Sequence, residues 1–508
     1  MAIPGRLIKA GISLNQKLNF DFKSPHDHQV DQLRELLSTA KNTSFGKYYA
    51  FKELLKAEDV VKAYKSMVPI VDYHEMNNNW WEQQQKVPDI TWPGRPRFFA
   101  LSSGTTGKAS KRIPITDDFL QSMRSVGTSL VRSLPNFDFE KDLFETEILM
   151  LSSSANLSEK NGHFEGEISG INVNNFPDWY DWFYRPGKEI ASIDNWDERI
   201  AQIVKAAPDW NIGALAGIPS WVLIMLQEVM KAHKLKSIHQ VWPNLKVYAT
   251  GGVAFETYRK DFEAICDKPL TIIDTYLASE GFFSYTARPG TMAMELALAH
   301  GYFYEFIPFD ERGVDSQGNL LDKPLSLSLD EIEVDQEYVL VISTCAGLWR
   351  YVIGDVIKFS STDPFEIQIT GRTKFYLNVV GSQLSEEKMD KAIVELSDKN
   401  GVEINEYMVA AMKDQEGQYY HQWILVTNGE LEENVLTQEL DELLKTMNKN
   451  YGVARTKALK YIQTRLISKD TYHLYLNQTK KKGGQVKTPK VMSEEKMSEL
   501  LDLIKSNA

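Results

Sequence analysis

The stretch FFALSSGTTGKASK, residues Phe98–Lys111, decides the fold of this chain. Its first residues, Phe98–Leu101, form a short apolar run that predicts a β-strand. The remainder offers hydroxyls, flexible glycines and backbone N–H donors, which are the groups that cradle a polyphosphate. It is not a Walker A loop, because only two residues separate its glycines and alanine follows Lys108. Taken alone, the same stretch is also compatible with a surface linker rich in Ser, Thr and Gly.

Similar apolar runs that end in glycine or small polar residues recur along the chain, and helical patterns follow them, as in α/β proteins. The clearest predicted strands are Glu147–Leu151, Val247–Thr250 and Leu270–Asp274. Two later β-rich runs, Tyr338–Ser343 and Val356–Phe359, lack long intervening helices. They predict a more barrel-like or antiparallel layer, so we expect an α/β protein with mixed sheets.

The chain is expected to divide into two domains. Helical patterns at Asp27–Leu37 and Phe51–Lys65 open the first part, where their role is packing. The composition shifts after Gly371, and the helices and strands that follow predict a small α+β domain. We therefore expect a large N-terminal domain of residues 1–370 and a small C-terminal domain of residues 371–508.

The overall composition predicts a soluble globular protein. The 508 residues are 43% hydrophobic and contain 69 Asp and Glu against 57 Lys and Arg. This acidic balance argues against nucleic-acid binding, which requires basic side chains that displace counterions from phosphates. Cys266 and Cys345 have neither the spacing of a zinc site nor that of a disulfide framework. No stretch reaches the ~18–20 apolar residues that cross a bilayer, and no signal-peptide core is present, so we expect a cytoplasmic protein without a membrane partner.

A second motif, TYLASEG at Thr275–Gly281, combines an aromatic ring, a hydroxyl and a carboxylate after a predicted strand. A carboxylate beside phosphate-binding hydroxyls repels the ligand unless a hard cation bridges them, so Glu280 indicates Mg²⁺. The alternative is a helix cap at Ser279 with a solvated Glu280.

Three further stretches complete the set. In WRYVIGDV, Asp355 follows a glycine between apolar runs and is placed to accept ribose hydroxyls, although a plain β-turn is the commoner meaning of Gly-Asp. The motif GRTK, residues 371–374, opens the small domain, and QVKTPK, residues 485–490, lies near its end. Lysine runs are usually solvated, so only the order of the whole set singles out Lys487.

In this order the motifs resemble the adenylate-forming superfamily, and more closely its auxin-responsive Gretchen Hagen family of acyl-acid amido synthetases. The resemblance covers about Phe98–Val491. Residues 102–111 are similar to the phosphate loop in the longer form that the amido synthetases have, without the usual proline. Residues 251–254 resemble the glycine loop that borders adenine, and 276–280 resemble the Tyr-Gly-x-Thr-Glu motif. Residues 371–372 resemble the hinge segment that precedes a small, mobile C-terminal domain.

The resemblance implies a two-step ligase that uses ATP and Mg²⁺ to activate a carboxylic acid and to join it to an amino acid. Tyr276 would cover the adenine, Asp355 would hold the ribose and Arg372 would reach the nucleotide from the hinge. Glu280 would hold the metal, and Lys487 would act in catalysis with it. The implied ATP-binding residues are Ser102, Ser103, Thr105, Thr106, Lys111, Gly252, Val253, Tyr276, Ser279, Asp355 and Arg372.

The chain also departs from the family pattern. Val352 stands where the family has the arginine of Tyr-Arg-x-Gly-Asp, so that contact is either absent or supplied by Arg350. Lys490 and the run 480–482 are rivals of Lys487. An acyl-CoA ligase and a nucleotide-binding protein without activity remain alternatives to the amido synthetase.

The acyl pocket is harder to place. Residues 164–173 and 215–221 lie upstream of the adenine loop and are candidates for its lining, although core packing explains their apolar residues equally well. Trp179, Trp182 and Tyr184 could line a site for an aromatic acid, with core packing as the favoured alternative.

Overall fold

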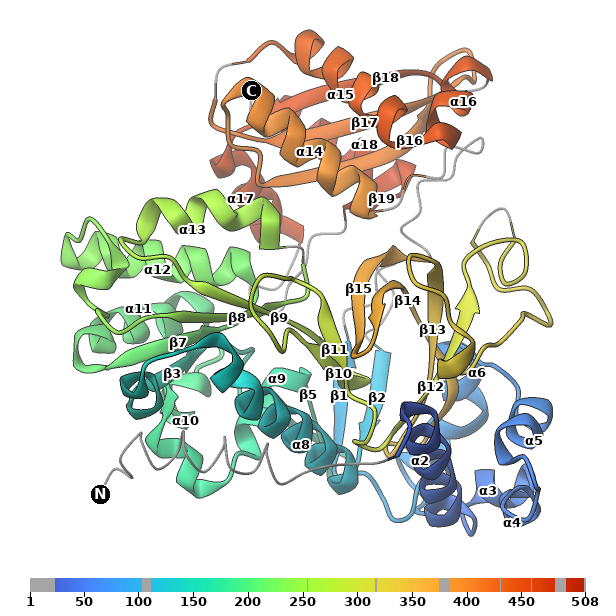
Figure 1. The fold of residues 1–508 in the computed structure, drawn as a ribbon. Coiled ribbons are helices and arrows are strands. Elements are labelled where there is room, and N and C mark those ends of the chain that lie inside the picture. The colour runs from blue at the N-terminus through green and yellow to red at the C-terminus, as the bar shows by residue number, and fades with distance from the viewer. Residues whose placement is uncertain are drawn as a thin grey trace.

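The computed structural model describes residues 23–102, 111–253, 255–315, 318–373, 384, 386–429, 431–457, 459–479 and 490–506. Figure 1 shows a large domain below a smaller one, which is coloured orange to red and begins with helix α14 (Glu386–Asn400). Both domains combine helices and sheets, as the sequence predicts.

The large domain is built on an 11-stranded mixed sheet with the order β12-β13-β14-β15-β11-β10-β9-β8-β7-β3-β6. Strands β6, β3, β7, β8 and β9 are parallel, whereas the strands from β9 to β12 pair antiparallel. The predicted antiparallel layer is therefore confirmed. The strand bounds are β3 Glu147–Met150, β6 Tyr184–Arg185, β7 Ile212–Ala216, β8 Val247–Gly251, β9 Thr271–Ala278, β10 Gly281–Tyr285, β11 Met294–Leu296, β12 Tyr302–Pro308, β13 Glu337–Thr344, β14 Leu348–Thr362 and β15 Phe365–Arg372.

Helices cover both faces of the parallel part. Successive strand residues point to opposite faces, so neighbouring residues pack against different helices. In β8, Tyr248 packs with residues of α11 (Trp196–Ala206), α12 (Pro219–His233) and α13 (Arg259–Ile265). Its neighbour Val247 belongs to a separate cluster that contacts Leu130 of α8 (Asp117–Ser133).

A second sheet of the large domain contains both ends of the stretch Phe98–Lys111. Its order is β2-β1-β5-β4. The bounds are β1 Phe98–Ser102, β2 Lys111–Ile115, β4 Ser158–Lys160 and β5 His163–Gly166. The predicted strand at Phe98–Leu101 is thus confirmed, and it pairs antiparallel with β2.

The N-terminal helices confirm one sequence prediction and correct another. Helix α2 (Pro25–Ala40) contains the predicted segment and is capped by Ser24, whose side chain accepts a hydrogen bond from the backbone of Asp27. The segment Phe51–Lys65 is not one helix but two, α4 (Phe51–Leu54) and α5 (Val60–Met67). Asp59 caps α5 and so starts a new helix inside the apparent pattern. Shorter helices are α3 (Ser44–Tyr48), α6 (Tyr73–Met76), α7 (Glu82–Gln84), α9 (Ile168–Asn174) and α10 (Lys188–Ala191).

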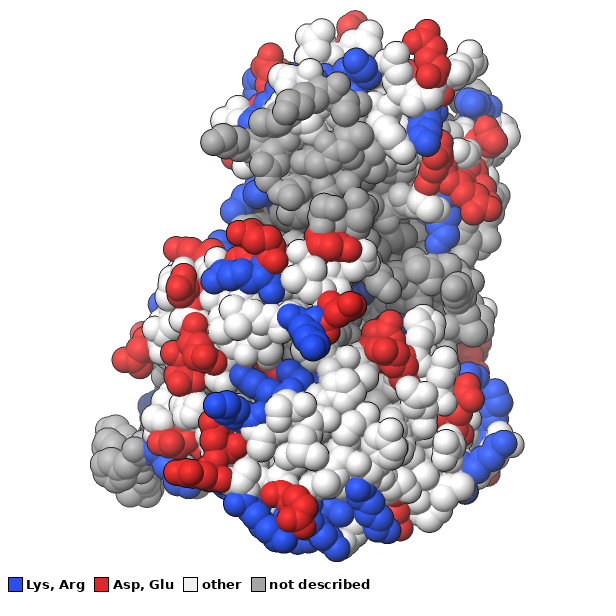
Figure 2. Space-filling model, turned by 90° about the vertical axis from the view of Figure 1, so that its right-hand side faces the viewer, with Lys and Arg blue, Asp and Glu red and all other residues white. Residues whose placement is uncertain are grey.

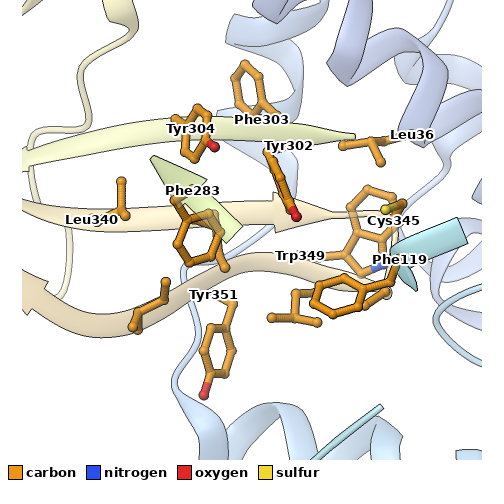
Figure 3. Packing of buried hydrophobic residues seen from close by; sticks show 14 of the residues in the cluster. Leu36, Phe119, Phe283, Tyr302, Phe303, Tyr304, Leu340, Cys345, Trp349 and Tyr351 are labelled. Carbon is orange, nitrogen blue, oxygen red and sulfur yellow. The ribbon is translucent and has the colours of Figure 1, made fainter. Parts of the chain in front are cut away.

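Aromatic side chains from several strands fill the core between the antiparallel layer and the N-terminal helices. Figure 3 shows Phe283, Tyr302 and Trp349 gathered with Phe119 of α8. Phe283, Tyr302 and Trp349 are fully buried, and each such side chain stabilises the fold by roughly 1.5–3 kcal/mol through removal of apolar surface from water. This core rigidly supports the strands β10 and β14, on which the candidate site is built.

The small domain has a sheet of order β18-β17-β16-β19 with helices on both faces. Helices α14, α15 and α16 pack on one face, and α17 and α18 pack on the other. The remaining bounds are α15 Glu433–Met447, α16 Lys449–Lys457, α17 Lys469–Thr479, α18 Glu494–Ser506, β16 Glu406–Lys413, β17 Tyr419–Val426, β18 Leu459–Ile467 and β19 Val491–Met492.

The surface carries mixed charge. On the face drawn in Figure 2, acidic and basic side chains of the described residues are interspersed and form no broad basic area. No helix within the described ranges is long and apolar enough to cross a membrane.

Candidate active site

The site is organised around the carboxylate of Asp355 on β14. Strand register places Asp355 directly opposite Arg372 of β15, and Arg372 Nε donates to Asp355 Oδ1 over 2.5 Å. From β9, the hydroxyl of Tyr276 donates to Asp355 Oδ2, also over 2.5 Å. The negative charge of Asp355 raises the pKa of Arg372, and burial raises the pKa of Tyr276. Residues of three strands therefore orient one carboxylate through short hydrogen bonds.

Glu280 lies beside this group, in the turn that joins β9 to β10. Gly281 pairs with Ala278 across the hairpin, so Ser279 and Glu280 form the turn itself. Glu280 is only 6% exposed, and its Oε1 accepts a 3.4 Å hydrogen bond from the hydroxyl of Tyr351. Burial raises the pKa of the Glu280 carboxyl, while the charges of Lys111 and Arg372 act in the opposite direction. The alternative of a helix cap with a solvated glutamate is therefore wrong.

The glycines at the end of β8 border the same strands. Gly251 pairs with Thr275 of β9, and a Cβ on Gly251 would approach the Thr275 carbonyl oxygen to 2.6 Å. Gly252 adopts a φ of +85°, which favours glycine. This backbone can therefore approach a ligand closely at the carboxyl end of a parallel strand, where ligands of such sheets bind. Val253 follows at the same edge.

Strands β1 and β2 bring the base of the hydroxyl-rich loop to the site. Ser102 and Lys111 face each other as the last pair of the β1–β2 ladder. Lys111 Nζ lies 5.2 Å from the ring centroid of Tyr73 and contributes the charge that acts on Glu280. Ser102 and Lys111 thus mark the two ends of the loop close to the acidic residues.

Not every sequence-predicted residue is placed. Tyr276, Glu280, Asp355, Arg372 and Lys111 form one electrostatically connected group, with Ser102, Gly252, Val253 and Ser279 on the adjoining strand ends. Ser103, Thr105, Thr106, Lys374 and Lys487 lie outside the described residues.

Of the two alternatives for the missing arginine at Val352, a contact supplied by Arg350 is wrong. Arg350 is 4% exposed and points to β12, where its Nη2 donates to Glu305 Oε2 over 2.7 Å. Its Nη1 donates to the backbone carbonyls of Lys65 and Val68. The partner of Asp355 is Arg372 instead.

The β-turn interpretation of Gly354-Asp355 is also wrong, because both residues lie inside β14. Gly354 has a φ of +93° there, and its carbonyl accepts a hydrogen bond from the backbone N–H of Thr373, the residue after β15. The glycine is thus an irregular point of the strand, adjacent to the carboxylate.

Sequence reasoning missed two tyrosines of the site. Tyr351 supports Glu280, and Tyr73 lies under Lys111 and also accepts a hydrogen bond from the backbone of Arg112. Tyr351 stands four residues before Asp355 in β14, but the irregular point at Gly354 lies between them, so strand alternation alone does not relate their side chains. The contact of Tyr351 with Glu280 is known only from the structure.

Lys490, the rival of Lys487, is occupied within the small domain. Its Nζ lies 2.6 Å from Asp390 Oδ1 and 3.4 Å from Glu386 Oε1. The ammonium group also lies 5.2 Å from the ring centroid of Tyr407. A buried, doubly paired lysine fits a structural role in this arrangement of the domains.

The aromatic residues considered for an acyl site do not line a common cavity. Trp179 and Trp182 are 59% and 70% exposed, whereas Tyr184 is fully buried and packs against Phe176 and Tyr180. Core packing therefore explains Tyr184 alone.

Family models identify the chain along most of its length. Residues 15–206 match the GH3 family N-terminal domain, 296–372 the GH3 family central domain, and 387–496 the GH3 family C-terminal domain. The chain belongs to the GH3 family. The resemblance inferred from the ordered motifs is thereby confirmed.

Curated relatives of this GH3 protein include two named plant enzymes. Indole-3-acetic acid-amido synthetase GH3.8 of Oryza sativa subsp. indica is 28% identical over 313 residues, which are 56% of this chain and 49% of the relative. Jasmonoyl–L-amino acid synthetase JAR4 of Nicotiana attenuata is 27% identical over 289 residues, 53% of this chain and 48% of the relative. The GH3 chain thus spans about half the length of the curated relatives it matches.

Solved structures share the fold. AtGH3.15 acyl acid amido synthetase in complex with 2,4-DB has a TM-score of 0.79 at 16% identity, covering 100% of this chain and 97% of that one. 2-Hydroxyisobutyryl-CoA ligase in complex with 2-HIB-AMP has a TM-score of 0.58 at 12% identity, covering 94% and 92%. The GH3 chain therefore has the fold of the adenylate-forming ligases.

Proposed function

We propose that this GH3 protein is an ATP-dependent acyl-acid amido synthetase. The observation that carries the proposal is the hydrogen-bonded Tyr276–Asp355–Arg372 group, in which Tyr276 and Asp355 are buried and which lies near Glu280 and Lys111. A carboxylate accepts hydrogen bonds at both oxygens, so one oriented by a guanidinium and a phenol suits the hydroxyls of a ribose.

The other proposed ATP contacts surround this group. Ser102, Ser103, Thr105 and Thr106 contact the phosphates, and Lys111 supplies a supporting positive charge. Gly252 and Val253 border the adenine, Tyr276 and Ser279 flank the nucleotide, and Arg372 reaches it from the end of β15. Positioning and charge neutralisation are the main contributions of such residues to transfer at phosphorus.

The residues present fit one Mg²⁺ bound together with the phosphates. Mg²⁺ is usually held by one or two carboxylates and substrate phosphates, and Glu280 is a buried carboxylate with cationic neighbours. Within the described ranges no group of three or more His, Cys, Asp or Glu could hold a metal ion without a ligand's help. When bound, the ion would neutralise charge that develops on the phosphate oxygens.

In the first proposed step, a carboxylate oxygen of the acyl acid attacks the α-phosphorus of ATP. The bond to the β-phosphate breaks, and pyrophosphate leaves with the electron pair. Lys487 approaches the α-phosphate in this step. In the second step, the amine of an amino acid attacks the acyl carbonyl carbon, loses a proton and displaces AMP, so that an amide forms.

The domain boundary at Gly371 is part of the proposal. Residues 1–370 would carry the acyl and ATP sites, and residues 371–508 would rotate about Arg372–Lys374 between the steps. The described strand β15 ends at Arg372, and the next described helix begins at Glu386. This supports a connection between two separately folded units.

The amine acceptor is proposed from the relatives, whose names specify amido and amino acid products. An acyl-CoA ligase is the second candidate, because a 2-hydroxyisobutyryl-CoA ligase shares the fold. A nucleotide-binding protein without activity is the third. Small-molecule acids and amino acids would be the partners, without nucleic acid or membrane, and the two free cysteines support a reducing cytoplasm.

Pyrophosphate release separates these candidates. The protein is incubated with ATP, Mg²⁺ and a panel of carboxylic acids, alone and with amino acids or CoA. An amido synthetase releases pyrophosphate with an acid and turns over faster with an amino acid. Faster turnover with CoA indicates the ligase, and no release with any acid contradicts both enzymes.

A further inference from the structure

A second polar group lies away from the candidate site, where the two domains touch. Asp261 of α13 is 7% exposed, and its Oδ2 accepts a hydrogen bond from Asn405 of the small domain. Lys469, the first residue of α17, has its Nζ 3.8 Å from Asp261 Oδ1 and 3.1 Å from Glu403 Oε2. Figure 1 shows α17 next to α13.

The contact extends to both sides of Asp261 along the same element. The Tyr258 hydroxyl, on the turn η7 (Phe255–Tyr258), donates to Glu406 Oε1 of β16. Lys260 pairs with Asp398 of α14. Since η7 begins directly after the glycine loop 251–254, the small domain is docked on the element that continues from the candidate nucleotide site.

Two carboxyls at this contact, those of Asp261 and Glu403, share one cationic neighbour, Lys469. The Lys469 Nζ lies within 4 Å of a carboxylate oxygen of both Asp261 and Glu403, and two carboxyls that share one site do not both ionise easily, because like charges repel. The other charged or titratable groups are paired elsewhere or are cations: Lys260 with Asp398, Glu406 with Tyr258, and Lys469 facing both acids. One ammonium therefore faces two carboxyls.

The direction of the proton effect follows from burial. Burial first, and then the neighbouring carboxyl of Glu403, raise the pKa of Asp261. The docked state therefore holds a proton at this pair of carboxyls. Because the docked state binds it more tightly than a separated state would, docking is favoured at low pH and weakens as the pH rises through the raised pKa.

We propose that Asp261 and Glu403 form a proton-dependent latch between the domains. While the pair shares a proton, it holds the small domain against α13. When both carboxyls ionise, Lys469 neutralises only one of them, and the remaining repulsion releases the domain. The latch goes beyond the proposed reaction and does not require it.

Small-angle X-ray scattering of the full chain without nucleotide, from pH 6 to pH 9.5, tests the latch. The wild-type radius of gyration should increase with pH, with the ratio of docked to released molecules falling by up to about tenfold per pH unit, the limit for one linked proton. Asp261→Asn keeps a neutral donor toward Glu403 and should stay compact throughout. Glu403→Gln removes the second acid and should also lose the transition.

Asp398→Asn is the matched control, because it removes an acid of the same interface that is paired with a single lysine. It should retain the wild-type transition. A wild-type radius that is constant with pH would overturn the latch, as would the wild-type transition in both Asp261→Asn and Glu403→Gln. All readouts are independent of catalysis, so a failure here leaves the proposed ligase untouched.

Discussion

Removal of one oxygen atom tests how the nucleotide site is built. In Tyr276→Phe the aromatic ring remains, packed at 5.0 Å and 65° against Phe283, and only the hydroxyl that donates to Asp355 is lost. A hydrogen bond to a charged group contributes about 1.5–3 kcal/mol. Since Arg372 still holds the other carboxylate oxygen, we expect about 1.5 kcal/mol, or about a tenfold rise in the Kd of ATP.

The loss should be specific to the ribose hydroxyls. In equilibrium binding, Tyr276→Phe and Asp355→Ala should weaken ATP but leave 2′,3′-dideoxy-ATP nearly unchanged, with Asp355→Ala the more severe change. Tyr351→Phe is the matched control, because it removes a buried tyrosine hydroxyl that bonds to Glu280 instead. Equal weakening of both nucleotides in Tyr276→Phe, or no change at all, would refute the assignment of its hydroxyl to Asp355.

Three further expectations concern other parts of the molecule. Glu280→Gln should raise the Mg²⁺ requirement and slow single-turnover acyl-adenylate formation on the order of 10²-fold, and an unchanged rate at limiting Mg²⁺ contradicts its role. Lys487→Ala should slow adenylation far more than aminolysis of a supplied acyl adenylate. Lys490→Met should mainly lower the thermal stability of the small domain. The reverse pattern would assign the catalytic role to Lys490 instead of Lys487. Glu305→Ala leaves the Arg350 charge buried and unpaired, so urea unfolding should show a loss of about 3–5 kcal/mol, and a loss below about 1 kcal/mol would argue against an isolated charge.

The local patterns of the chain were sufficient to predict many elements. Helix α2 and the strand before Ser102 follow from periodicity and end signals that lie within a few neighbouring residues. The prediction of one helix at Phe51–Lys65 was wrong because Asp59 caps a second helix inside the continuous apolar pattern. The cap at Asp59, and not the apolar periodicity, determines where the second helix begins.

The partners within the site were less predictable, because they depend on strand register. Asp355 meets Arg372 only because β14 and β15 pair in one register, and nothing near Val352 in the sequence indicates it. Likewise, the burial of Glu280 follows from the pairing of β9 with β10, which distinguishes a hairpin turn from a helix cap. The ordered motifs identified the residues, and long-range pairing determined their contacts.

Isotope transfer tests the proposed acyl-adenylate chemistry most directly. An acid that supports pyrophosphate release is prepared with both carboxylate oxygens as ¹⁸O. It is incubated with ATP, Mg²⁺ and an amino acid, and the masses of the products are measured by mass spectrometry. If the carboxylate attacks the α-phosphorus and the amine then displaces AMP, each AMP carries one ¹⁸O atom and is formed in equal amount with the amide. Unlabelled AMP, or ADP and phosphate in its place, would contradict the mechanism.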